Sequence, residues 1–66
     1  NYVGFDTMYT GACLGGNPGK LYINPVDGLY YRNPELTEFA PNGFYMANGI
    51  WINLLDGFLE DTDACG

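Results

Sequence analysis

The fold is decided by residues 29–65, which read LYYRNPELTEFAPNGFYMANGIWINLLDGFLEDTDAC. In this stretch, short apolar runs are separated by the dipeptides Asn42-Gly43, Asn48-Gly49 and Asp56-Gly57. Asn-Gly and Asp-Gly tolerate the positive φ angles that two-residue hairpin turns require. Their spacing predicts a small antiparallel meander with strands over residues 44–46, 50–54 and 58–60.

The upstream half of the chain is predicted to add shorter elements to this meander. Residues 1–9 are interpreted as a terminal strand, and the glycine-rich residues 10–20 as a loop. Two short strands, 21–23 and 29–31, are expected around a turn at 24–28. Asn33-Pro34 is typical of a helix start, which predicts one helical turn over 33–37. The prediction is therefore a single all-β domain over residues 1–66, a small antiparallel meander or sandwich-like module with one short helical turn.

The two cysteines suggest how so small a domain is stabilised. A chain of 66 residues buries only about 60% of the surface that its unfolded form exposes, so its core is marginal. Cys13 and Cys65 are the only cysteines and lie near opposite ends of the sequence. Paired, they close a loop of about 53 residues, which is worth roughly 4 kcal/mol. We expect a disulfide-stapled domain in an oxidising compartment. Two free buried thiols in a cytosolic protein are the alternative.

The strand predicted over residues 50–54 is apolar on both faces, because successive side chains of a strand alternate in direction. A chain this short has few elements to cover the second face, so a neighbouring copy or subunit is expected there. Residues 1–9 are also expected to be able to pair with a neighbour's sheet edge. The alternative is an ordinary β domain with tyrosines on its solvated face. The predicted interface residues are Tyr2, Phe5, Tyr45, Met46 and Trp51.

Charge and composition argue against several classes of function. The net charge is −6, with two cations, eight carboxylates and no histidine. Two cations cannot form a footprint on nucleic acid, and anionic membranes are disfavoured for the same reason. No apolar run is long enough for membrane insertion. Serine is absent as well, so no nucleophile with a base is expected. The carboxylates at residues 60, 61 and 63 are interpreted as a solvated acidic segment rather than a calcium site. We therefore expect no enzyme, metal or cofactor.

Residues 29–65 resemble a small cysteine-bracketed, Tyr/Gly-rich β module of phage structural and tail proteins and of bacterial surface repeat proteins. The resemblance lies in a Leu-Tyr strand at 29–30, an Asx-x-x-Leu-Thr turn at 33–37, the segment Phe-Ala-Pro-Asn-Gly-Phe-Tyr at 39–45, and Gly-x-Trp at 49–51. Gly57 and Cys65 complete the pattern, and Cys13 with residues 21–22 resembles its opening half. At 46–47, Met-Ala stands where the module is usually serine-rich. The resemblance implies an extracellular or virion context without catalysis.

Together these features predict a non-enzymatic structural subunit of an extracellular assembly, either a filament or a phage virion. Its partners would be copies of itself or a neighbouring structural subunit, at the cell surface, outside the cell or in a virion. The alternative is a monomeric adhesin or carbohydrate-binding tip module, in which exposed aromatic rings stack on sugars.

Overall fold

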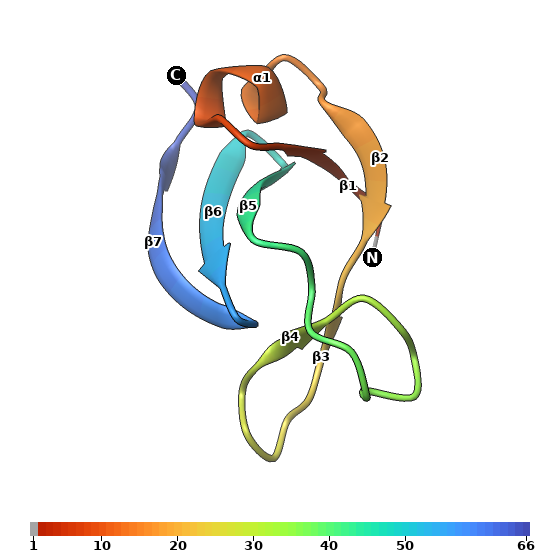
Figure 1. Cartoon of the computed structure of the whole chain (residues 1–66). Helices are drawn as coiled ribbons and strands as arrows, with labels where there is room; N and C mark the ends of the chain where they lie inside the picture. The colour runs from red at the N-terminus through yellow and green to blue at the C-terminus, as the bar shows by residue number, and fades with distance from the viewer. Residues whose placement is uncertain (1) are drawn as a thin grey trace.

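The computed structural model describes residues 2–66, with side chains from residue 4 onward. It contains two antiparallel sheets and one short helix, so the all-β prediction is confirmed (Figure 1). In chain order, the elements are β1 (Tyr2–Asp6), α1 (Tyr9–Cys13), β2 (Asn17–Lys20), β3 (Tyr22–Ile23), β4 (Tyr30–Tyr31), β5 (Gly43–Ala47), β6 (Ile50–Leu55) and β7 (Phe58–Ala64).

The predicted meander is confirmed as β5, β6 and β7, and each strand extends beyond its predicted limits. Asn48 and Gly49 have φ angles of 55° and 75° between β5 and β6. Asp56 and Gly57 have 50° and 79° between β6 and β7. Two consecutive positive φ angles are the mark of the tight turns that match strand twist. The third dipeptide makes no hairpin turn, because Gly43 is already the first residue of β5.

The five-stranded sheet has the order β2-β1-β5-β6-β7, so the first strand of the chain lies inside the sheet. Phe5 pairs with Asn17 of β2 on one side and with Tyr45 of β5 on the other. The predicted strand over residues 1–9 is thus shorter than expected. It ends at Asp6, and Tyr9 begins α1, while residue 1 lies outside the described part of the chain. The predicted pair of short strands around residues 24–28 is confirmed as the separate β3–β4 hairpin.

Residues 10–20 do not form the predicted loop. They contain most of α1 and the whole of β2. A five-residue helix with a glycine in it has little intrinsic stability, so packing has to hold it in place. Ala12 is fully buried, and the strand beneath carries Gly4, where a Cβ would lie 2.2 Å from the carbonyl oxygen of Gly15. The absence of a side chain at residue 4 lets α1 and the turn after it lie directly on β1.

The helical turn predicted over residues 33–37 is also corrected. Leu36 has a φ of 60°, which is incompatible with a right-handed helix. The Asn33 side chain does bond to the backbone, but its Oδ1 accepts the N–H groups of Thr37 and Glu38, both at 3.1 Å. The segment is therefore a side-chain-stabilised turn.

The core lies on one face of the large sheet, beneath the loops that join β2 to β5. Leu54, Ala40 and Tyr45 are 1%, 2% and 3% exposed, and Leu21 completes this buried cluster. Phe5 packs against it, with its ring centroid 4.8 Å from that of Tyr45. The opposite face of the sheet was expected to need an external partner. The chain itself covers part of that face with α1, which contacts β1, β5 and β6.

A disulfide joins Cys13 at the end of α1 to Cys65 just after β7, with an S–S distance of 2.05 Å. The N–H of Cys65 donates to the carbonyl oxygen of Gly49 at 2.8 Å. The bond therefore ties the helix to the end of the sheet at the β5–β6 turn. It confirms the predicted staple and is compatible with an oxidising, extracellular environment.

Both edges of the large sheet carry features that discourage further strand pairing. β7 is exposed along its whole length and contains three carboxylates, Glu60, Asp61 and Asp63. β2, at the other edge, is four residues long and includes Pro18, which has no N–H to donate. Charged side chains, proline and short length are common means of protecting sheet edges.

Burial raises the pKa of Tyr45 to about 12, from an ordinary value of 10.0, and its hydroxyl donates to the carbonyl oxygen of Pro41 at 2.5 Å. Between these two pH values the unfolded chain loses a proton that the folded chain keeps. The free energy of unfolding should therefore fall as pH rises from about 10 to about 12. We expect Tyr45→Phe, which cannot ionise, to show a shallower fall in urea unfolding curves over this range. Parallel curves for the two proteins would contradict this assignment.

Candidate binding groove and exposed apolar ends

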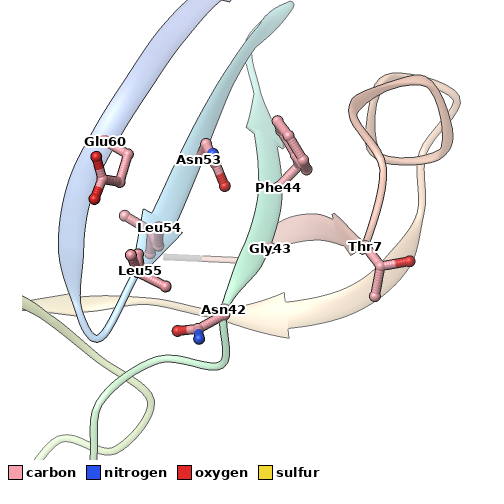
Figure 2. Close-up of a pocket in the computed structure, with 8 residues that line it drawn as sticks. All are labelled: Thr7, Asn42, Gly43, Phe44, Asn53, Leu54, Leu55 and Glu60. Carbon is pink, nitrogen blue, oxygen red and sulfur yellow. The ribbon is translucent and has the colours of Figure 1, made fainter.

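An open groove of about 400 Å³ lies at the end of the large sheet away from the disulfide. Figure 2 shows Asn53 of β6 between Glu60 of β7 and Phe44 of β5. Phe44 and Asn53 are paired residues, so they project from the same face of the sheet. The groove combines polar groups with apolar walls, and its lining residues are Thr7, Asn42, Gly43, Phe44, Asn53, Leu54, Leu55 and Glu60.

A β-bulge brings Glu60 to the groove. Asn53 pairs with Asp61 and Leu54 pairs with Leu59, so Glu60 is the extra residue and has no partner in β6. An extra residue of this kind re-aims side chains, and bulges are frequent beside binding sites. Sequence reasoning missed this role because the alternation of β7 offers no sign of a register shift. The acidic segment predicted at residues 60, 61 and 63 thus contains one residue, Glu60, that lines the groove.

Some polar groups of the groove already have hydrogen-bond partners within the protein, and others do not. Asn42 is fixed, because its Oδ1 accepts the N–H of Asp56 in the β6–β7 turn at 2.8 Å. Thr7 is fixed by Asp6, whose Oδ1 accepts the Thr7 N–H at 2.6 Å. Within residues 4–66, by contrast, the side chains of Asn53 and Glu60 have no hydrogen-bond partner. The groove thus offers a carboxamide and a carboxylate that are open to a ligand.

Three aromatic rings form a cluster where α1 meets the sheet. The ring centroids of Tyr9 and Trp51 are 5.7 Å apart, and those of Trp51 and Phe44 are 5.3 Å apart. Tyr9 and Phe44 also meet edge to face at 6.2 Å. Such tilted contacts are the arrangement that aromatic quadrupoles favour. Phe44 is therefore held from one side by this cluster while it lines the groove.

The residues predicted to line an interface do not come together on one surface. Tyr45 is buried in the core, and Phe5 packs against it. Trp51 and Met46 are paired on the opposite face, both half-buried, with Trp51 against Tyr9 of α1. The side chain of Tyr2 lies outside the described part of the chain. The residues missed by sequence reasoning are those on turns and on the helix, where no periodicity marks a side chain as exposed.

Seven of the ten large exposed apolar side chains lie at two places instead. At the α1 end they are Met8, Tyr9 and Leu14, with Leu14 90% exposed. The hairpin end consists of Ile23, Val26, Phe39 and Phe58, with Val26 92% exposed. Figure 1 shows α1 and the β3–β4 hairpin at opposite ends of the molecule, whose extents are 31 × 20 × 18 Å.

The tip of the β3–β4 hairpin is held by its own hydrogen bonds. Asn24 Oδ1 accepts the N–H of Val26 at 2.9 Å, and the Tyr31 hydroxyl donates to Asp27 Oδ2 at 2.7 Å. The Tyr31 hydroxyl, with the N–H of Leu29, lowers the pKa of Asp27 below its ordinary value of 3.8. Asp27 in turn raises the pKa of Tyr31. The most exposed apolar side chain of this end is thus presented on an ordered turn.

Other classes of site find little support in the described residues. Within residues 2–66, no group of three or more His, Cys, Asp or Glu side chains could hold a metal ion. Both cysteines are in the disulfide. In the same part of the chain, α1 is the one helix, and no helix has the length and apolar character to cross a membrane.

No protein-family model matches the chain, and no match was found among curated proteins or solved structures. The resemblance of residues 29–65 to a phage and surface-protein module therefore stays a prediction. Function has to be argued from the groove and the two apolar ends.

Proposed function

We propose that this chain is a non-enzymatic structural subunit or module of an extracellular assembly, a filament or a virion, that associates with copies of itself through apolar and aromatic contacts. The large number of exposed apolar side chains, compared with the buried ones, supports this function. Among residues 4–66, six apolar residues are buried and ten large apolar residues are exposed. Exposed apolar groups scattered singly are normal, but a gathering of them marks an interaction surface.

The placement of the apolar groups favours head-to-tail contacts. The α1 end and the hairpin end have different compositions and lie at opposite ends of the long axis (Figure 1). Contacts between two different patches propagate into filaments or close into rings, depending on the rotation between neighbours. The ring of Phe39 packs directly against Gly57, so closely that an added Cβ on Gly57 would lie 2.6 Å from it. The hairpin end is therefore continuous with the β6–β7 turn.

Strand exchange through residues 1–9 is the less favoured route of association. β1 is paired on both sides within its own chain, so exchange would first require two ladders to open. Deleting residues 1–9 would also remove Phe5 from the core, and loss of assembly would then be indistinguishable from unfolding. Side-chain contacts at the two ends can be tested without this ambiguity.

Sedimentation velocity over a range of protein concentrations tests this function. We expect the wild-type protein to form species larger than a 7.3 kDa monomer, and more of them in added salt, which screens the repulsion between chains of net charge −6. Leu14→Ser and Val26→Ser remove one apolar side chain from each end. Because these two residues are almost fully exposed, each variant should fold and remain monomeric.

Thr37→Ser, a change at an exposed polar position that leaves the net charge at −6, is the matched control and should associate like the wild type. A wild-type protein that stays monomeric at high concentration and high salt would contradict self-association. Assembly that persists in both end variants would place the contacts elsewhere, with Trp51 and Met46 as the next candidates.

A further inference from the structure

We infer that the groove beside Phe44, Asn53 and Glu60 binds a neutral carbohydrate. This inference does not depend on self-association. The groove volume of about 400 Å³ is within the ~300–1,000 Å³ range of small-molecule sites. The groove is open rather than enclosed, which suits a ligand that is part of a longer polymer.

The mixture of walls matches the two chemical sides of a sugar ring. A pyranose presents C–H groups on its faces and hydroxyl groups around its rim. Phe44 and the exposed Leu55 supply apolar surface for the faces. The Asn53 carboxamide both donates and accepts hydrogen bonds, and the Glu60 carboxylate accepts them. One hydroxyl rim can therefore satisfy both of these unpartnered groups.

Charge narrows the class of ligand to neutral sugars. The groove lining contains Glu60 and no lysine or arginine. Asp61 is paired with Asn53, so its carboxylate projects from the same face of the sheet beside the groove. A phosphate, sulfate or uronic acid would meet uncompensated repulsion there. A single lining carboxylate is also a poor set of ligands for a calcium ion.

The site is built in advance of binding. The β-bulge sets the backbone of Glu60 next to Asn53, the aromatic cluster with Tyr9 and Trp51 holds Phe44, and the Asp56 N–H fixes Asn42. Groups that are ordered before binding lose little entropy when a ligand arrives. The strands β5, β6 and β7 thus form the floor of the site. The β6–β7 turn, bonded to Asn42, lies at one end of it (Figure 2).

Amide chemical-shift titration with neutral disaccharides tests this inference directly. The probes are cellobiose, maltose, lactose and N,N′-diacetylchitobiose, each taken to about 20 mM so that binding with a Kd in the low millimolar range, about −4 kcal/mol, is still detected. We expect at least one of them to give saturable shifts centred on Phe44, Asn53 and Glu60. Asn53→Ala should weaken that binding at least about tenfold, which corresponds to about 1.4 kcal/mol.

Two further variants distinguish a sugar site from a cation site. Glu60→Gln keeps an acceptor oxygen without the charge, so it should weaken binding of the same disaccharide, but less than Asn53→Ala does. Glu35→Gln, outside the groove, should bind like the wild type. The inference is overturned if no disaccharide gives saturable shifts, or if Asn53→Ala leaves them unchanged. It is likewise overturned if calcium chloride alone shifts the same amides and Glu60→Gln abolishes that effect, because the groove would then be a cation site. Sedimentation of Asn53→Ala should match the wild type, which keeps this outcome distinct from that of self-association.

Discussion

Removal of the Cys13–Cys65 disulfide is expected to lower the free energy of unfolding by roughly 4 kcal/mol. The two cysteines are 52 residues apart, so the bond restricts nearly the whole unfolded chain. Small domains have little stability to lose, on the order of 5 kcal/mol. The double variant Cys13→Ala/Cys65→Ala should therefore be largely unfolded at room temperature by circular dichroism, and its urea midpoint should fall close to zero.

Wild-type protein treated with a reductant is the control for this variant, because it keeps both sulfur atoms. Reduced wild type and the double variant should have the same stability. If the reduced protein stays fully folded while the variant unfolds, packing of the cysteine side chains matters more than loop closure. If both keep the oxidised protein's midpoint, the bond does not stabilise the fold.

Gly4→Ala is expected to cost about 3 kcal/mol, the largest effect that we expect from a single added methyl group. The new Cβ would lie 2.2 Å from the Gly15 carbonyl oxygen and 2.9 Å from its carbon. Both atoms belong to the backbone, so the clash cannot be relieved by a side-chain rotation. The turn after α1 has to move away from β1, and Ala12 of α1 then loses part of the packing that buries it. Urea unfolding of the oxidised protein measures the change.

Gly66→Ala provides the matched comparison, because a Cβ there meets no atom within 4 Å. Its stability should stay within about 0.5 kcal/mol of the wild type. Equal stabilities for Gly4→Ala and Gly66→Ala would show that α1 does not lie against β1 as described.

Local signals made the C-terminal half of the fold predictable. Asn48-Gly49 and Asp56-Gly57 set the turns of the meander because their preference for positive φ is a property of the dipeptide itself. The disulfide followed from there being just two cysteines. The alternation of residues 50–54 predicted two apolar faces, and the face with Ile52 and Leu54 is the one that packs in the core.

What could not be predicted depends on contacts between distant residues. The helix α1 forms where propensity is poor, because Gly4 leaves space for it and Cys13 is tied to Cys65. Tyr45 was predicted to lie at an interface, but Leu21 and Ala40 pack against it in the core. These two residues lie outside the meander, so the strand sequence alone does not reveal that Tyr45 is buried. The groove depends on the bulge at Glu60, which arises from the pairing of β6 with β7 rather than from either strand alone.

The position of β1 within the sheet also affects how readily the disulfide forms. Pairing of Phe5 with Tyr45, together with the contacts of α1 on β5 and β6, already holds residue 13 beside residue 65. In the folded but reduced chain, the two thiols would therefore meet at a high effective concentration. Thermodynamic linkage makes this relation mutual: the sheet favours the bond by the same free energy by which the bond favours the sheet. Formation of the disulfide and pairing of the strands therefore stabilise each other.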